Sequence, residues 1–273
     1  MNGLMQNNKL IDCVTFFDNN YIFEIRYNIL KNFIDYFVVC ESKFDHTGKP
    51  KKINFLMKND YDSKKIKYFL LEKPFPKSTN RWQNQALQRE YLLSCLDFAN
   101  PNDYIFFSDP DEIIRPEILI NFELKNKYGI FLQDCFNYKI NLFNPYETPW
   151  EGTRVAKKIN IKSIDFMRHK VLRKNLKYSF LRLDKEKNIQ IFNDAGWHFN
   201  NLMTYDEMSL KLKTFAHSEF SDEKFSSVDV IKYKVDNRMD LFERGHLYKK
   251  VDLNDKFPKY ILDNKIKFKD FIL

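Results

Sequence analysis

The sequence predicts an α/β fold built on a mixed central sheet. Two observations support this class. Short apolar runs alternate with helical patterns up to Ser108, which indicates β-α-β units and parallel strands. Beyond residue 128, strand-like runs follow one another without helices between them, which indicates an antiparallel or mixed extension. The 273 residues, 44% of them hydrophobic, are enough for one large domain with a sizeable core.

The N-terminal elements can be placed in order. Residues 10–17 indicate a strand, residues 21–32 carry apolar side chains at helical spacing, and residues 35–41 indicate a second strand. This β-α-β unit implies a parallel pair with a right-handed crossover. The next expected elements are a strand at 67–71, an amphipathic helix at 82–98 that ends at an Asn-Pro-Asn turn, and a strand at 103–108.

The C-terminal pattern is less regular. The expected elements are strands at 129–143, 156–161 and 189–192, a helix at 205–220, and a tail from residue 228 that wraps the core. No internal repeat and no Gly/Ser-rich linker interrupts this order, so we expect a single domain.

Charge and cysteine usage narrow the function classes. The net charge is +8, but the lysines are scattered among 37 acidic residues, so we expect no nucleic-acid partner. Attraction to phosphorylated or lipid-linked substrates fits the charge equally well. The four cysteines are widely spaced, so we expect free thiols in the core and a reducing compartment. The first nine residues lack the apolar stretch of a signal peptide, and no apolar run is long enough to span a membrane, so a cytoplasmic protein is expected.

The most informative segment is Tyr104-Ile-Phe-Phe-Ser-Asp-Pro-Asp-Glu112, a strand-like run that leads into Asp109, Asp111 and Glu112. Crowded carboxylates repel one another, so they usually need a cation or exposure to water. Oxygen ligands suit Mg²⁺ or Mn²⁺, which keep positions open for substrate phosphates. In α/β proteins, ligands collect at the carboxyl ends of strands. One interpretation of this segment is a site for a metal-bound diphosphate. The other is an acidic turn that caps a helix from Ile113 onward.

Five segments, spread in order over residues 10–250, resemble glycosyltransferase family 17. They are FFDNNYIFEIRYNIL, DYFVVCESKFDHTGKPK, RWQNQALQREYL, DYIFFSDPDEIIRP and GWHF. The resemblance implies a GT-A (Rossmann-like) nucleotide-sugar transferase fold over residues 1–273. Its nucleotide-binding half would lie at about 10–115, and its acceptor-binding half with a C-terminal wrap at about 116–273. It also implies an inverting enzyme that uses a UDP-sugar and a divalent metal, Mn²⁺ or Mg²⁺.

Two departures from the family pattern are visible. Pro110 stands where family members often have a small residue, and Asn19-Asn20 replaces a usual Asn-Glu pair. The second change removes the glutamate of the family pattern, which puts the role of a carboxylate at that turn in doubt. The animal members also carry a signal anchor, which this sequence does not show, so their compartment and their N-glycan acceptor are not carried over.

The resemblance implies a metal site made by three residues. Asp109 and Asp111 match the metal motif of the family, with Asp111 as the direct ligand and Asp109 reaching the donor ribose or a metal-bound water. His198, within Gly-Trp-His, resembles the late histidine that completes metal or diphosphate binding in several GT-A enzymes. A histidine beside Trp and Phe can equally be a core residue with satisfied hydrogen bonds.

The donor nucleotide would contact residues at the ends of the first two strands. Phe16 could stack on the base, and Glu41 could accept the uracil N–H. Arg89 on the long helix could bind the diphosphate through its guanidinium fork. The alternatives are that Phe16 packs in the core, that Glu41 is an ordinary charge at a strand end, and that Arg89 lies on a helix surface.

An inverting transfer also needs a proton acceptor near the acceptor hydroxyl. Glu112, Glu151 and Asp134 are candidates, with Asp194 as a further one, and the sequence does not choose among them. We expect the product to carry a β-linked sugar, with GlcNAc as the favoured one, on an oligosaccharide or lipid-linked glycan. Peripheral membrane association would fit the positive net charge. The alternative classes are a metal-dependent phosphohydrolase or nuclease and a noncatalytic binding protein.

Overall fold

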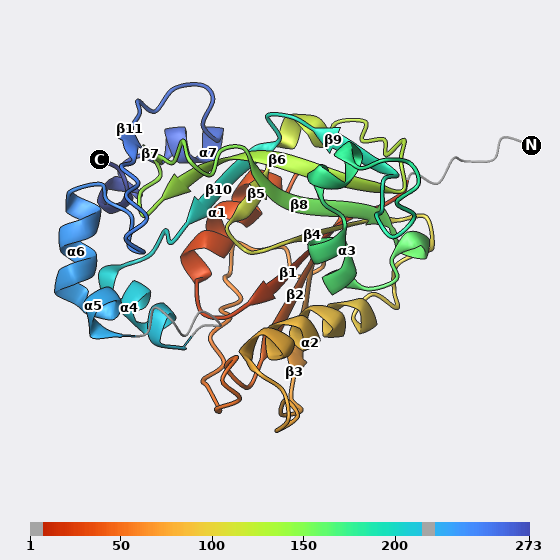
Figure 1. The fold of residues 1–273 in the computed structure, drawn as a ribbon, viewed down its shortest axis with the longest axis horizontal. Coiled ribbons are helices and arrows are strands. Elements are labelled where there is room, and N and C mark those ends of the chain that lie inside the picture. The colour runs from red at the N-terminus through yellow and green to blue at the C-terminus, as the bar shows by residue number, and fades with distance from the viewer. Residues whose placement is uncertain (1–7, 215–221) are drawn as a thin grey trace, which may run out of the picture.

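The computed structural model describes residues 8–214 and 222–273, which form one mixed sheet flanked by helices (Figure 1). Its parallel half has the strand order β3-β2-β1-β4. These strands are β1 (Leu10–Phe16), β2 (Tyr36–Ser42), β3 (Ile66–Leu71) and β4 (Tyr104–Ser108). Because all four run in the same direction, their carboxyl ends meet at one edge of the sheet. The expected β-α-β opening and its parallel pair are therefore confirmed.

The second half of the sheet is mixed, as expected. Next to β4 lie β8 (Trp150–Lys157), antiparallel to it, and then β6 (Tyr128–Asn137), antiparallel to β8. Strand β10 (Gly196–Asn200) runs parallel to β6 and also pairs antiparallel with β5 (Glu112–Ile114). The carboxyl ends of β6 and β10 therefore lie at the same edge as that of β4. The remaining strands are β7 (Leu142–Phe143), β9 (Ile189–Phe192) and β11 (Lys249–Lys250).

The central strands are buried on both faces, and successive side chains enter two different cores. One core contains Val14, Phe16, Val39 and Phe106, together with α1 (Asn20–Leu30) and aromatic residues of the C-terminal tail. The other contains Ile11, Cys13, Val38, Cys40, Ile105 and Phe107, together with α2 (Arg81–Ser94) and α3 (Ile164–Lys170). The expected wrap of the tail is seen in Phe257, Ile261 and Phe268, which are buried in the first core.

Side-chain caps set where the helices on the sheet begin. Asn19, Asn80 and Ser163 accept hydrogen bonds from the first turns of α1, α2 and α3, respectively. A third core joins β7 to helices that gather at one end of the sheet (Figure 1). The other helices are α4 (Tyr205–Thr214), α5 (Glu223–Ser226), α6 (Val228–Asp236) and α7 (Lys259–Asp263), with the 3₁₀ turns η1 (Pro116–Leu119), η2 (Lys158–Asn160), η3 (Arg173–Lys177) and η5 (Lys269–Phe271).

Several boundaries differ from the sequence expectations. The strand expected at 129–143 is broken at Tyr138, which has a φ of 66° and begins a turn between β6 and β7. The strand expected at 156–161 was wrong in its bounds, because β8 ends at Lys157 and a 3₁₀ turn follows. The helix at 82–98 ends at Ser94, and residues 215–220 of the helix expected at 205–220 lie outside the described residues. Among the described helices, none has the length and apolar composition needed to cross a bilayer.

Candidate active site

The acidic turn after β4 is held by backbone contacts from distant parts of the chain. Glu112 N–H donates to the Asp109 carbonyl at 3.0 Å, and Phe199 N–H donates to the Asp111 carbonyl at 2.9 Å. The buried guanidinium of Arg26, which is paired with Asp12, donates to the Glu112 carbonyl at 2.6 Å. No helix begins at Ile113, because Glu112–Ile114 is strand β5. The helix-cap interpretation of this turn is therefore wrong.

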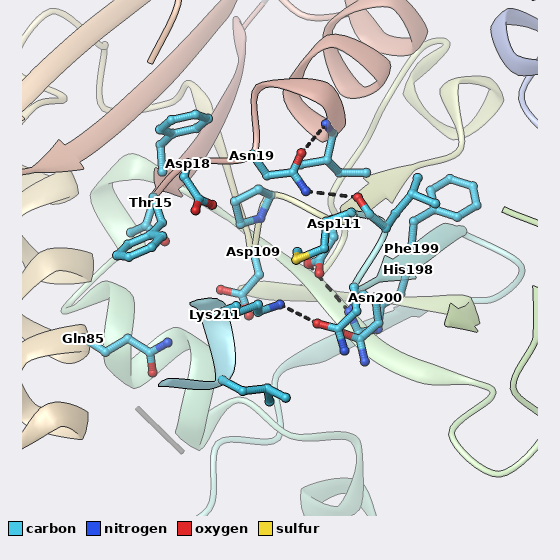
Figure 2. A pocket seen from close by; sticks show the side chains of 18 of the residues that line it. Thr15, Asp18, Asn19, Gln85, Asp109, Asp111, His198, Phe199, Asn200 and Lys211 are labelled. Atoms are coloured by element: carbon cyan, nitrogen blue, oxygen red, sulfur yellow. Dashed lines mark hydrogen bonds and ion pairs between the residues drawn. The ribbon is translucent and has the colours of Figure 1, made fainter. Parts of the chain in front are cut away.

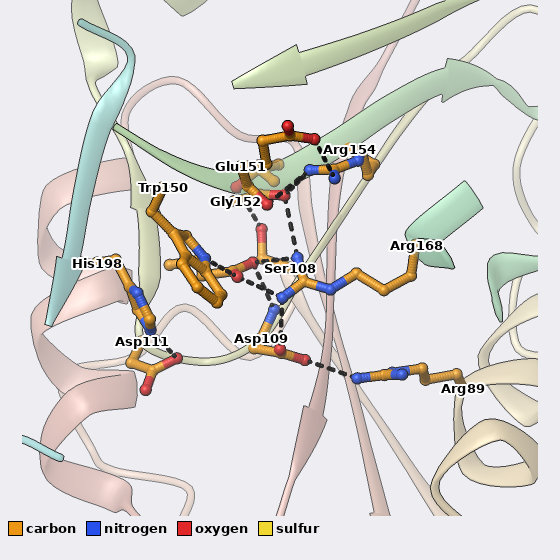
Figure 3. A network of polar contacts seen from close by, with 12 residues as sticks. Arg89, Ser108, Asp109, Asp111, Trp150, Glu151, Gly152, Arg154, Arg168 and His198 are labelled. Atoms are coloured by element: carbon orange, nitrogen blue, oxygen red, sulfur yellow. Dashed lines mark hydrogen bonds and ion pairs between the residues drawn. The ribbon is translucent and has the colours of Figure 1, made fainter. Parts of the chain in front are cut away.

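Arg168, on α3, neutralises two carboxylates of the turn (Figure 3). Its Nη2 lies 2.9 Å from Asp109 Oδ2 and 2.6 Å from Glu112 Oε1. Arg89 Nη2 lies 3.5 Å from the other oxygen of Asp109. Burial alone would raise the pKa of Asp109, but Arg168 and Arg89 outweigh it and hold that pKa well below its usual range. Asp109 is therefore ionised, and both of its oxygens face arginine.

Glu112 is fully buried and has partners on both oxygens. Besides its two contacts with Arg168, it accepts a hydrogen bond from Trp150 Nε1 at 2.7 Å. Trp150 in turn stacks on His198, with 4.7 Å between ring centroids and 29° between planes. Glu112 therefore fixes the indole that supports the imidazole. This geometry suits a positioning residue and leaves no free oxygen for the proton-acceptor role that the sequence allowed.

His198 faces Asp111 across a short gap. The distance from His198 Nε2 to Asp111 Oδ1 is 3.6 Å, and His198 Nδ1 lies 3.7 Å from the buried Cys135 thiol. Burial lowers the pKa of His198, but the Asp111 carboxylate outweighs it, so the net pKa lies well above its ordinary value. Burial raises the pKa of Asp111, and the facing imidazole brings it below the usual range. The two groups form a charged pair.

A cleft of about 300 Å³ opens over this pair. Figure 2 shows Asp109 and Asp111 between Asp18, at the end of β1, and His198 and Asn200 of β10. One wall comes from the nucleotide-binding half expected from the sequence, and the other from the C-terminal half. The first wall includes Thr15, Phe16, Phe17, Asp18, His46, Gln85 and Gln88, and the second includes Phe199, Asn200, Asn201, Met203, Lys211 and Phe242.

The cleft includes some of the expected site residues and excludes others. Phe16 lines it but is 2% exposed, and its ring packs edge-on against Phe23 and Phe55. Glu41 lies outside the cleft. Its carboxylate accepts hydrogen bonds from the backbone of Asn54 and Phe55, so it orders the loop that follows β2.

The other expected residues outside the cleft have partners of their own. Arg89 lies behind Asp109 and bridges it to Asp165 at 3.6 Å. Glu151 accepts a hydrogen bond from the backbone N–H of Arg173 at 3.0 Å. Asp134 also lies outside, where burial and nearby Asp194 raise its pKa. The geometry does not bring Glu151 or Asp134 to the cleft.

Three residues of the site were missed from the sequence. Arg168 lies in a stretch, Asp165-Phe-Met-Arg-His-Lys170, that resembles an ordinary charged helix. Asp18 follows the first strand by two positions, and that strand-end spacing is the signal that could have found it. Burial raises the pKa of Asp18. Lys211 enters from α4, and its Nζ lies 2.8 Å from Asn201 Oδ1; nothing in its local sequence distinguishes it from other helix lysines.

The donor set fits a divalent ion in part. Asp111 and His198 offer one carboxylate and one imidazole from opposite sides of a gap, and Mn²⁺ accepts both ligand types. Asp109 fits poorly because Arg168 and Arg89 face its oxygens. The described residues contain no cluster of three or more His, Cys, Asp or Glu side chains that could hold a metal alone. An ion here would therefore need further ligands from substrate and water, as Mg²⁺ and Mn²⁺ commonly do.

Comparison with known families decides the class of protein. The model for glycosyltransferase family 17 matches residues 2–139, just over half of the chain. The chain belongs to glycosyltransferase family 17. It is therefore a glycosyltransferase, and the acidic turn after β4 lies within the matched region of this family 17 protein. Its sheet confirms the expected GT-A class, with a parallel β-α-β half and that turn at the end of β4.

The solved structures that this family 17 chain matches are remote from it. HddC from Yersinia pseudotuberculosis is 9% identical, with a TM-score of 0.36, over 68% of this chain and 91% of its own. A glycosyltransferase involved in glycosylation of the major capsid of PBCV-1 is 8% identical, with a TM-score of 0.31, over 67% and 81%. An active-site mutant of LgtC is 12% identical, with a TM-score of 0.30, over 67% and 73%. No curated protein sequence matches the chain.

Proposed function

We propose that the protein is an inverting, metal-dependent glycosyltransferase that transfers GlcNAc from UDP-GlcNAc to a glycan acceptor and forms a β-linkage. One observation carries the proposal. Asp111 and His198 meet in a cleft whose first wall is the carboxyl edge of the parallel strands and whose second wall is the C-terminal half. Nucleotides bind at such edges in α/β folds, and the second wall leaves room for an acceptor.

The donor would lie along the first wall. Phe17 lines the cleft and is less buried than Phe16, so we assign base stacking to Phe17. Glu41 is engaged in the loop after β2, and we assign its expected contact with the uracil N–H to Asp18. The donor diphosphate would face Asp111, His198 and Lys211. A bound divalent ion would neutralise charge on the departing UDP, which favours cleavage of the bond to the sugar.

The protein's own residues prepare this site. Arg168 holds the carboxylates of Asp109 and Glu112 in fixed positions, and Trp150 keeps the imidazole of His198 facing Asp111. Preorganised charges of this kind contribute more to catalysis than groups that must reorient during the reaction. The acceptor would be an oligosaccharide or a lipid-linked glycan, because the second wall combines amide side chains with the apolar Met203 and Phe242.

The first test measures binding of UDP by thermal unfolding, with and without Mn²⁺. A ligand that binds only the folded protein raises the melting temperature. We expect a larger shift with UDP and Mn²⁺ together than with either alone, and we expect Asp111→Asn to remove the part that depends on metal. Equal UDP affinity of Asp111→Asn and the parent protein in Mn²⁺ would refute the metal-binding role of Asp111.

The second test identifies the donor and the stereochemistry. Release of UDP from a panel of UDP-sugars ranks the donors, and proton NMR of the product gives the anomeric coupling. We expect UDP-GlcNAc to be the best donor and the coupling to be that of a β-linkage. A coupling typical of an α-linkage would contradict the inverting mechanism. Phosphate release without glycosyl transfer would favour the phosphohydrolase alternative.

A further inference from the structure

Residues 173–187 belong to the segment that connects α3 to β9 (Figure 1). They present large apolar side chains to solvent. Phe180 is 82% exposed, Leu181 is 72% exposed and Leu183 is 93% exposed. Leu176 and Tyr178 are exposed in the same segment. Single exposed apolar residues are normal on soluble proteins, but a cluster of this kind marks an interaction surface. We call residues 173–187 the docking loop.

The docking loop is also strongly basic. Its fifteen residues include six Lys or Arg and two Asp or Glu, a net charge of +4 within a chain of net charge +8. Lys174 and Lys177 are exposed beside the apolar side chains. Half of the excess positive charge is therefore concentrated where the apolar side chains are most exposed.

Hydrogen bonds close the docking loop at its base. The buried Asn175 side chain donates to the Lys170 carbonyl at 2.7 Å and to the Glu186 carbonyl at 3.0 Å, which joins the two ends. Inside the loop, the guanidinium of Arg182 pairs with Asp184 at 2.7 Å. Compact surface loops with joined ends are frequently functional. The apolar side chains are thus held outward by a defined backbone.

The docking loop starts close to the active site. Arg168 of the catalytic network lies five residues before Arg173, whose backbone N–H donates to Glu151 next to Trp150. The start of the loop therefore lies near the carboxyl edge of the sheet, whereas its end leads into β9, whose Ile189 pairs with Tyr128 at the start of β6.

We propose that the docking loop binds the surface of a bilayer that contains anionic phospholipid. Exposed Phe and Leu can insert into the interfacial region of a bilayer, while flanking lysines and arginines remain among anionic headgroups. A protein partner would need an apolar pocket together with acidic groups, whereas an anionic membrane supplies both features without a specific shape. The proposal is independent of the donor sugar and of the acceptor.

Vesicle sedimentation with the full-length protein tests the proposal. The vesicles are phosphatidylcholine alone, or phosphatidylcholine with about 30% phosphatidylglycerol, and contain no glycan. We expect binding to the anionic vesicles that weakens as salt increases. The triple variant Phe180→Ser, Leu181→Ser, Leu183→Ser should reduce the partition coefficient at least tenfold. The double variant Lys174→Gln, Lys177→Gln should weaken binding severalfold and reduce its salt dependence.

Ile266→Ser is the matched control, because Ile266 is 88% exposed but lies in the C-terminal tail. It should bind as the parent does, and circular dichroism should show that every variant is folded. Equal binding of parent and triple variant, or no binding of the parent to anionic vesicles, would overturn the proposal. Self-association that the triple variant abolishes, without vesicle binding by the parent, would instead identify a contact between two copies. Because no donor or acceptor is added, each outcome is separate from the test of transferase activity.

Discussion

At the scale of single residues, Asp109 and Glu112 gain a shared partner only through folding, because Arg168 arrives from a helix more than fifty residues later in the chain. The buried pair Arg168–Glu112 would be unfavourable without good geometry, since desolvation of two charges opposes their attraction. Here the guanidinium forks between two carboxylates and also donates to the Gly152 carbonyl at 3.0 Å. Arg168 thereby lowers the pKa of Asp109 beside the cleft.

Arg168→Lys should separate charge from geometry at this position. Lysine keeps the positive charge but lacks the planar fork that reaches both carboxylates. We expect a stability loss of about 1–3 kcal/mol from lost hydrogen bonds to charged groups, and a fall in kcat of about 10²-fold as Asp109 moves. Urea unfolding and UDP release measure the two effects. Arg173→Lys, five residues away with an exposed side chain, is the control and should change neither.

His198→Ala tests the residue that faces Asp111. We expect transfer to fall about 10²-fold or more. The stability loss should be no more than about 2 kcal/mol, because the Asp111 carboxylate lines the cleft and stays partly exposed to water when its partner is removed. Thermal unfolding and activity are measured on the same preparation. His169→Ala, which removes an exposed histidine paired with Asp165, should leave both unchanged. A large loss of melting temperature in proportion to the loss of activity would return His198 to a core role.

At the scale of elements, the site depends on the pairing of β5 with β10. This pairing aligns Glu112 with His198 and Ile113 with Trp197, and it brings the acidic turn against the histidine strand. Gly196 permits this close approach. It has a φ of +144°, and a Cβ at this position would lie 2.0 Å from the Ile113 carbonyl oxygen. A side chain here would push the two strands apart.

Gly196→Ala should therefore destabilise the protein strongly, by about 3 kcal/mol or more, because it combines backbone strain with a clash against backbone. Gly48→Ala is the matched control. Gly48 also has positive φ, at +87°, but a Cβ added there would meet no atom within 4 Å. Only the conformational strain of about 1–3 kcal/mol then remains. Urea unfolding compares the two variants, and equal losses would show that the strand contact contributes little.

The sequence predicted the parallel half well because each strand is a continuous apolar run, which is typical of strands buried on both faces. It predicted β8 poorly. Trp150-Glu-Gly-Thr-Arg154 contains a glycine and two charges, and it becomes a strand only through its partners β4 and β6. The short strand β5 has no periodicity to detect, and its partner lies far along the chain, as the pairing of Ile114 with Gly196 shows.

The candidate site was predictable to a similar extent. Asp111 and His198 were expected to meet, and the structure brings them together. Each belongs to a recognisable motif, the acidic turn after β4 and Gly-Trp-His in β10. Glu41 also lies near a strand end, but its carboxylate accepts hydrogen bonds from the loop that follows β2 and does not reach the cleft. Arg168 lacks any local signal, since a helix arginine gains its role only from where α3 packs. Contacts between distant segments therefore account for most of what the sequence did not show.

At the scale of the whole molecule, an ionic cluster ties the C-terminal region to the sheet. Asp240 is buried, pairs with Arg244, and accepts from Tyr248 at 3.0 Å. Arg244 also reaches Glu147 at 2.7 Å. Burial raises the pKa of Asp240, but the hydrogen bonds from Arg244 outweigh it, so the net pKa is below its ordinary value. The ionised carboxylate is therefore favoured by the folded state.

This lowered pKa gives a pH dependence of known sign. An unfolded Asp titrates near about pH 3.9, so the contribution of Asp240 is complete above that pH and is lost as the pH falls through the folded pKa. Asp240→Asn should lower the free energy of unfolding by about 1–3 kcal/mol at about pH 7. The difference from the parent should narrow below about pH 4. Urea unfolding at several pH values measures it, and a difference that stays constant would exclude this linkage.

Because His198 and the partner strand of the acidic turn both lie late in the sequence, synthesis of the chain completes the candidate active site late. The region that the family model matches, residues 2–139, contains the acidic turn but neither the histidine nor Arg168. A nascent chain that has emerged only that far therefore holds the turn's carboxylates with Arg89 but without Arg168. The turn therefore gains its second arginine, and Asp111 gains its histidine, only once the C-terminal half has been made.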